Sequence, residues 1–314
     1  MKTIVKVLLI SLIMAVLSQC KKGTEPYVII PDNNFLNALI ILGVDKNGDG
    51  NINPDEAAEV TFLDVSSCSI SDLKGIEAFV NLDTLYCIAN QLTNLNVSSN
   101  AALNTLSGMN NSLTSLDVSN NPALSYLDCS NNLLTSLDLS NSPALSYLDC
   151  ANNLLTSLDV TNTPELNWML CENNSLTNLD LSNNPALNVL NCRNNSLTNL
   201  DVSNNPALND LHCEGNLLTS LDVSNNNKLY WLWCGYNLFT SLDLSNNPAL
   251  NSLFCDGNLL TSLDVSNNTA IGNLTIVSMP SLYKVCVWTM PFPPTGIIVD
   301  TTGSPNVYFT MDCN

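Results

Sequence analysis

The sequence predicts a solenoid of parallel β-sheet coils with little helix, because one pattern recurs at a constant interval. Cysteines recur every 21 residues, and the same register extends back to Gly108 and Cys87. Around each cysteine the chain reads Leu-x-x-Leu-x-Cys-x-x-Asn-x-Leu. A period of this length is typical of repeat architectures, whose units bury their apolar faces only by stacking. The regular cysteines are Cys129, Cys150, Cys171, Cys192, Cys213, Cys234 and Cys255.

Each repeat contains two halves of similar pattern. In one copy, Leu124, Leu127 and Cys129 belong to the first half, and Leu134 and Leu137 open the second. We expect these residues to face inward, and the asparagine of each repeat to satisfy exposed backbone groups with its amide. The nested pattern resembles the leucine-rich repeat, in particular the 21-residue bacterial subclass known as IRREKO. The resemblance implies a curved right-handed leucine-rich repeat solenoid over residues 60–277, a parallel sheet on one face and a binding role.

Both ends of a solenoid need covers. Residues 21–59 are expected to form a small helical N-terminal cap, with apolar residues from Phe35 to Ile40 at helical spacing after Asp32, the predicted N-cap. Residues 278–314 are expected to form a β-rich C-terminal cap, with valines interrupted by Pro291, Pro293 and Pro294.

Residues 45–56 fit the calcium-loop pattern D-x-[DN]-x-[DN]-G-x5-E at every defined position. Gly50 permits the sharp turn, and oxygen donors stand at the spacing that Ca²⁺ requires. The loop resembles that of an EF-hand or a dockerin, and we expect one structural Ca²⁺ that braces the cap. An acidic loop without metal is the alternative. The predicted ligands are Asp45, Asn47, Asp49, Asn51 through its carbonyl, Asn53 through water, and Glu56.

Residues 1–20 have the pattern of a signal peptide. Lys2 and Lys6 precede an apolar run that ends at Leu17, and Leu17-Ser18-Gln19-Cys20 follows. This ending resembles a bacterial lipoprotein signal, in which Cys20 would be lipidated, although Gln19 replaces the usual small residue. We therefore expect a cell-envelope protein, held at the outer membrane or cell surface by a lipid anchor, or alternatively a secreted one.

Charge and cysteine spacing exclude other classes. The net charge is −19, and the solenoid lacks the basic stripe that nucleic-acid binding needs. Stacked copies put the regular thiols side by side on parallel strands, a poor geometry for disulfides, so we expect small buried hydrophobes. Cys286 and Cys313 lie outside this column and are better disulfide candidates.

The first half of each repeat varies at its outward positions, whereas the second half barely changes. Variation confined to one strand face and rich in Tyr and Trp indicates a recognition surface, since aromatic side chains supply contact area at low entropic cost. Drift on an unused concave sheet is the alternative. The predicted ligand-binding residues are Tyr126, Tyr147, Trp168, Trp231, Trp233 and Phe254, with Arg193 and His212 as polar anchors.

An aspartate recurs in the constant half, from Asp117 to Asp264 at the same interval. These aspartates either accept hydrogen bonds from the turn that follows them or bind divalent cations loosely along the column. Catalysis is not expected, because His212 is the only histidine and Cys213 beside it points inward. We therefore expect a monomeric, non-enzymatic module that binds a protein or glycan on its concave face. A structural or adhesive surface spacer is the second reading.

Overall fold

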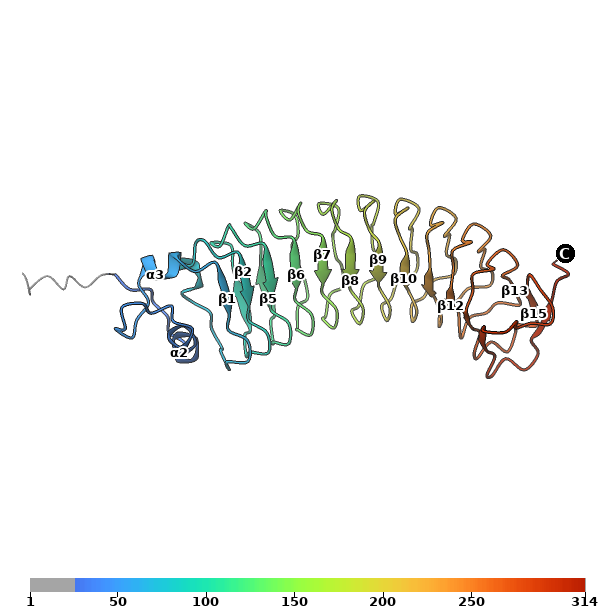
Figure 1. The fold of residues 1–314 in the computed structure, drawn as a ribbon, viewed down its shortest axis with the longest axis horizontal. Helices are drawn as coiled ribbons and strands as arrows, with labels where there is room; N and C mark the ends of the chain where they lie inside the picture. Colours follow the sequence, from blue (N-terminus) through green and yellow to red (C-terminus); the bar gives the residue numbers. More distant parts are fainter. Residues whose placement is uncertain (1–25, 314) are drawn as a thin grey trace, which may run out of the picture.

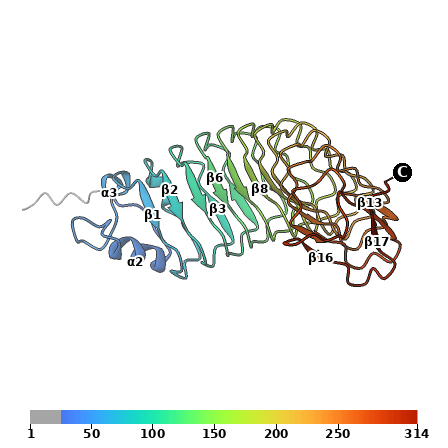
Figure 2. The same cartoon turned by 45° about the vertical axis from the view of Figure 1, so that its right-hand side comes forward.

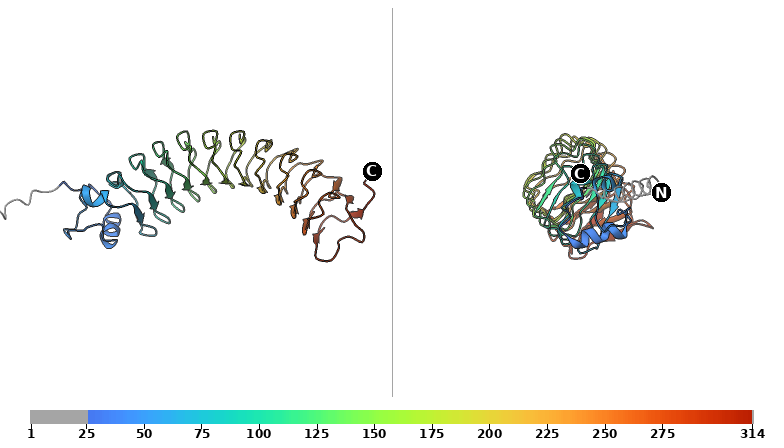
Figure 3. Two further views of the ribbon diagram at one scale, coloured as in Figure 1. Left: turned by 45° about the horizontal axis from the view of Figure 1, so that its top comes forward. Right: turned by 90° about the vertical axis from the view of Figure 1, so that its left-hand side faces the viewer.

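A computed structural model describes residues 26–313 and shows one continuous stack of coils bent into an arch (Figures 1 and 3). The predicted leucine-rich repeat solenoid with little helix is confirmed. Twelve strands, one from each successive coil, form the long sheet in the order β1-β2-β4-β6-β7-β8-β9-β10-β11-β12-β14-β16. Their bounds are Phe62–Asp64, Thr84–Tyr86, Thr105–Ser107, Tyr126–Asp128, Tyr147–Asp149, Trp168–Leu170, Val189–Asn191, Asp210–His212, Trp231–Trp233, Ser252–Phe254, Asn273–Thr275 and Ile298–Asp300.

The register of this sheet follows the repeat. All its pairs are parallel, and Tyr126, Leu127 and Asp128 lie opposite Tyr147, Leu148 and Asp149, one repeat later. The strands line the inner side of the arch, so the outward side chains of the long sheet form a concave face (Figure 3, left).

Leucines and cysteines fill the interior as expected. Leu124, Leu127, Cys129 and Leu134 are completely buried, and the corresponding residues of the other coils join them in one core. The seven regular cysteines and Cys87 are free thiols. Burial raises the pKa of these thiols, that of Cys87 to about 12, so they remain neutral and unreactive in the folded chain.

Asparagine amides close the turns between coils. The Asn132 amide donates to the carbonyls of Gly108 and Cys129, each at 3.0 Å, and its Oδ1 accepts the Leu113 N–H at 2.9 Å. The other coils repeat this arrangement, which joins three chain segments through one side chain. The predicted role of these asparagines is confirmed.

The second half of each repeat forms the other wall. Strands β3 (Asn94–Asn96) and β5 (Ser115–Asp117) pair at one end of this wall, and β13 (Ser262–Asp264) joins the C-terminal cap. The aspartate column lies here and caps its own turns: Asp222 Oδ1 accepts the Ser224 N–H at 2.9 Å. The local-bonding reading of the column is therefore confirmed, and such bonds lower the pKa of Asp222.

The N-terminal end carries helix α2 (Asn33–Ile41) and the short helix α3 (Pro54–Ala58), next to β1 (Figures 1 and 2). A 3₁₀ turn, Ile76–Ala78, lies in the first coil. Asp32 caps α2 with one carboxylate oxygen, and with the other accepts the N–H and hydroxyl of Ser71 at 2.8 Å. Burial opposes ionisation of Asp32, but the bonds from Ser71, Phe35 and Asp72 outweigh it and lower its pKa. One side chain thus ties the cap helix to the first coil.

The C-terminal end is closed by a three-stranded sheet in the order β13-β15-β17, which includes β15 (Lys284–Cys286) and β17 (Tyr308–Thr310). Cys286 and Cys313 form a disulfide, so the sequence preference for this pair is confirmed. Among the helices of residues 26–313, none combines the length and the hydropathy needed to cross a bilayer. The signal peptide and Cys20 lie outside the described residues.

Candidate recognition site on the concave face

Three columns of side chains make up the concave face between β6 and β12. The first column precedes the inward leucine of each strand, the second follows it, and the third follows the cysteine. In the coil of β6 these residues are Tyr126, Asp128 and Ser130. Because the strands pair in register, residues of one column stack directly on their counterparts in the next coil.

Aromatic side chains in these columns form two separate stacks. Tyr126 and Tyr147 lie parallel in the first column, with ring centroids 4.4 Å apart and an interplanar angle of 7°. In the second column, Trp233 stacks between His212, at 5.1 Å, and Phe254, at 4.1 Å. The register therefore places five of the eight predicted ligand-binding residues in direct ring contact, in two groups.

Trp168 and Trp231 have the most accessible rings of the predicted set. Each is 42% exposed in the first column, with Val189 and Asp210 between them. Tyr230 braces Trp231 edge-on at 4.9 Å. The two tryptophans thus flank a stretch of the face whose second and third columns are polar.

This polar stretch is a small charge network. Arg193 reaches Glu172 on one neighbouring coil and Glu214 on the other, each at 3.9 Å. His212 Nε2 lies 3.0 Å from Asp210 Oδ1, and its Nδ1 lies 4.0 Å from Glu214 Oε1. Both predicted polar anchors are therefore oriented by carboxylates before any ligand arrives.

Two further carboxylates lie beside the tyrosine stack. Asp128 is almost fully buried and accepts the Ser130 hydroxyl at 2.7 Å, while Asp149 accepts the Ala151 N–H at 3.0 Å. Burial raises the pKa of Asp149 to about 6, and the charges of Asp128 and Glu172 add to the shift. Burial also raises the pKa of Tyr147, and the carboxylates of Asp149 and Asp128 add to that shift.

The predicted calcium loop is held together by its own carboxylates. Asp45 accepts the N–H groups of Gly48 and Gly50, at 2.8 and 2.9 Å. Glu56 is buried, and its two oxygens accept the N–H groups of Lys46, at 2.8 Å, and Asn53, at 2.9 Å. Gly48 and Gly50 both have positive φ angles, which these turns require. The oxygens converge inward on the loop backbone, and their chemistry is that of a Ca²⁺ donor set.

Comparisons with known proteins agree with this architecture. The sequence matches no family model and no curated protein. Among solved structures, the chain is similar to the functional domain of InlJ from Listeria monocytogenes, which includes a cysteine ladder, with a TM-score of 0.82 and 35% identity. The match covers 88% of this chain and 61% of that one. This chain has the leucine-rich repeat fold.

More distant structures share this fold. The internalin InlF from Listeria monocytogenes has a TM-score of 0.63 and 19% identity, with 94% of this chain and 100% of that one covered. The leucine-rich effector protein YopM from Yersinia pestis has a TM-score of 0.59 and 24% identity, covering 89% and 85%. At these identities the likeness concerns architecture alone.

Several positions of this leucine-rich repeat chain that the sequence predicts to be outward are buried. Ser107, Asp128, Val189 and Ser252 belong to the variable outward set, yet all four are buried. Val189 lies opposite Trp168, and Ser252 lies opposite Trp231, so each of these small side chains has a large ring on the neighbouring strand. Glu172 and Glu214 were absent from the predicted ligand-binding set. The sequence could have indicated them, because each lies one repeat away from Arg193 in the same column.

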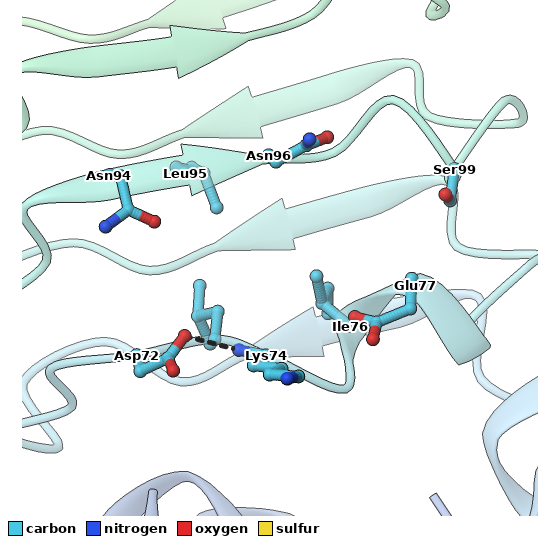
Figure 4. Close-up of a pocket in the computed structure, with 9 residues that line it drawn as sticks. Asp72, Lys74, Ile76, Glu77, Asn94, Leu95, Asn96 and Ser99 are labelled. Atoms are coloured by element: carbon cyan, nitrogen blue, oxygen red, sulfur yellow. Dashed lines mark hydrogen bonds between the residues drawn. The ribbon is translucent and has the colours of Figure 1, made fainter. Parts of the chain in front are cut away.

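Other features of the described residues do not form part of this face. A hollow of about 410 Å³ lies between residues 72–77 and β3, where Asp72 accepts the Lys74 N–H at 2.8 Å (Figure 4). None of the predicted ligand-binding residues lines it. Ligand atoms of Asp264, Cys286 and Cys313 lie within 4.8 Å of one another, but both sulfurs belong to the disulfide and are not free to bind a metal.

Proposed function

We propose that this is an exported binding protein that recognises a protein or glycan ligand on its concave aromatic face and catalyses no reaction. The observation that carries the proposal is the pair of aromatic stacks with half-exposed Trp168 and Trp231 beside them. Rings held by stacking lose little entropy when a ligand covers them. Contact with a macromolecule needs an extended face rather than a deep cavity.

A binding role suits the surroundings of His212 better than catalysis does. Its ring stacks on Trp233 and contacts Asp210 and Glu214, while the neighbouring Cys213 is completely buried. A nucleophile and a base must lie within hydrogen-bond reach of each other, and here the thiol faces the core. We assign His212 to ligand contact.

The proposal includes export and anchoring. The pattern of residues 1–20 supports a signal peptide, and Cys20 would carry a lipid that holds the protein at the outer membrane or cell surface. Labelling of cells with a radioactive or alkyne-tagged fatty acid tests this directly. Label should be incorporated into the wild-type chain and lost in Cys20→Ser.

Replacing an exposed ring tests recognition. Trp231→Ala should abolish capture of the ligand found by a glycan array or a panel of extracellular proteins, because 42% of this side chain is open to a partner. Tyr283→Ala removes a ring of similar exposure from the C-terminal cap and should leave capture unchanged. If the wild type captures nothing, or all three proteins behave alike, the second reading, a structural or adhesive spacer, replaces the first.

We also propose one structural Ca²⁺ in the loop of residues 45–56. Asp45, Asn47, Asp49 and Glu56 would bind it through side-chain oxygens, Asn51 through its carbonyl and Asn53 through water. The ion would neutralise carboxylates that now accept hydrogen bonds only from backbone N–H groups and the Asn51 side-chain amide, and so brace the cap.

Calorimetric titration with Ca²⁺ tests this site. Asp49→Asn should weaken binding at least about tenfold, because it removes one charge while its Oδ1 can still accept the Asn51 N–H. Asp55→Asn, a neighbouring acid outside the ligand set, serves as the control. Equal affinity in the two variants, or no heat in the wild type, would remove the metal from the proposal.

A further inference from the structure

The concave face carries a marked charge imbalance. Between β6 and β12 its three columns contain six acidic residues and one arginine. That arginine is already held between Glu172 and Glu214, at 3.9 Å from each. The acidic residues are Asp128, Asp149, Glu172, Asp210, Glu214 and Asp256.

These carboxylates are less well compensated than the aspartates on the opposite wall. Asp222 and its counterparts from Asp138 to Asp264 are exposed, accept an N–H from their own turn and face bulk water. On the concave face, one buried oxygen of Glu172 and one of Glu214 have no hydrogen-bond partner. Asp128 and Asp149 lie directly opposite each other on neighbouring strands. Burying like charges together costs free energy, which a cationic partner would recover.

Aromatic rings adjoin these acids. The Tyr126–Tyr147 stack flanks Asp128 and Asp149 on β6 and β7, and Trp168 belongs to the coil that carries Glu172. The faces of aromatic rings attract guanidinium and ammonium groups, and a neighbouring carboxylate adds an ion pair. Carboxylate and ring together thus suit the side chains of arginine and lysine.

We propose that the concave face between β6 and β12 docks an arginine- and lysine-rich segment of a protein partner. This rests on the proposed function and deepens it by choosing between protein and glycan. A neutral glycan could stack on the tryptophans but would leave the acidic columns uncompensated. An extended cationic segment crossing the strands would meet a carboxylate on five of the seven coils, those of β6, β7, β8, β10 and β12.

A binding titration with short fluorescent peptides tests the partner chemistry. The probe alternates arginine with glycine, and matched peptides carry asparagine or glutamate in place of arginine. The arginine peptide should bind, and its affinity should fall as salt rises from about 50 to about 200 mM, because ions screen the exposed part of the attraction. Binding of the asparagine peptide with equal affinity would overturn the proposal.

Charge-removing variants locate the binding. Asp149→Asn and Glu214→Gln should each lower the affinity for the arginine peptide about fivefold, which is the effect of losing one close ion pair near a protein surface. Asp222→Asn makes the same charge change off the concave face, keeps its turn bond and should bind as the wild type does. Equal weakening in Asp222→Asn would show attraction to the net charge of −19 alone, and would overturn the proposal.

The outcome also separates this inference from the function on which it rests. If Trp231→Ala abolishes capture of a neutral glycan while the arginine peptide never binds, recognition stands and the cationic partner is wrong. If no ligand depends on Trp231 and the arginine peptide does not bind through Asp149 and Glu214, both fail. Asp149→Asn retains an acceptor for the Ala151 N–H, so the test remains available even if Glu214→Gln folds poorly.

Discussion

At the scale of single residues, Asp149 shows how the concave face departs from what stability alone would favour. Its carboxylate is largely buried, faces Asp128 and Glu172, and lies beside the phenols of Tyr126 and Tyr147. A neutral side chain of the same shape would suit that position better. Acids retained where they destabilise the fold are often found at functional sites.

Asp149→Asn should therefore stabilise the protein near neutral pH. The folded-state pKa of Asp149 is about 6 and its ordinary value is 3.8, so the folded chain binds the proton more tightly. Stability from this group is then fully present below about pH 4 and lost as pH rises through about 6. We expect the Asp149→Asn variant to melt higher than the wild type at about pH 7.5, by on the order of 2 °C.

Thermal melts at two pH values check the direction of this change in stability. The advantage of Asp149→Asn should shrink at about pH 4.5, where the folded wild-type carboxyl is largely protonated, and disappear below about pH 4, where the unfolded chain is protonated as well. Asp222→Asn is the matched control. Its carboxylate has a lowered pKa, because hydrogen bonds from Ser224 favour the charged form, so this substitution should give no stabilisation at either pH. A destabilised Asp149→Asn at neutral pH would contradict the argument.

At the scale of elements, the coil is the unit that the sequence predicts well. The spacing from Cys129 to Cys150 is also the offset between paired strands, so periodicity alone sets both the strand register and the column in which each side chain lies. The inward leucines and thiols, the turn asparagines and the cap bonds of the aspartates follow from the same repeat.

Contacts across coils were less predictable. That Arg193 bridges Glu172 and Glu214 depends on side-chain reach along a column, which a single repeat does not show. Likewise, Val189 is buried although its position in the repeat is an outward one, and it lies opposite the large ring of Trp168 on the neighbouring strand. The aromatic face was predictable as a surface, whereas its division into two stacks with a charged stretch between them required coordinates.

Asn174 is one of the turn asparagines that join neighbouring coils. Asn174 donates to the carbonyls of Cys150 and Cys171, and its Oδ1 accepts the Leu155 N–H. Asn174→Ala leaves these backbone groups unpaired inside the turn, at a cost of about 2–4 kcal/mol in the free energy of unfolding. Urea titration followed by circular dichroism measures the loss.

Asn141→Ala provides the comparison for this measurement. Asn141 is exposed and donates once, to the Ser119 carbonyl, so water can replace its bond and the loss should stay below about 1 kcal/mol. Losses of equal size in the two variants would mean that the bridging bonds of Asn174 contribute no more than an ordinary surface contact.

At the scale of the whole molecule, the chain is a one-dimensional stack with reinforced ends. Each coil contacts its neighbours, so stability is approximately a sum of coil and interface terms, and the ends are where such a stack opens first. Asp32 ties the helical cap to the first coil through Ser71, and the Cys286–Cys313 disulfide closes the last sheet. The concave face lies between these two closures, on the most constrained coils.

Opening the C-terminal closure should therefore loosen the end and spare the middle. Cys313→Ser removes a cross-link with a sequence separation of 27, worth about 3.5 kcal/mol by loop-closure entropy. In hydrogen exchange, amides of β15 and β17 should exchange faster, while those of β8 and β9 should be unchanged. The reason is that a loss of stability in one coil affects mainly the coils in contact with it. Mild reduction of the wild type should reproduce the pattern, since the column thiols are already reduced. Faster exchange along the entire stack would instead mean that the solenoid opens as a single cooperative unit.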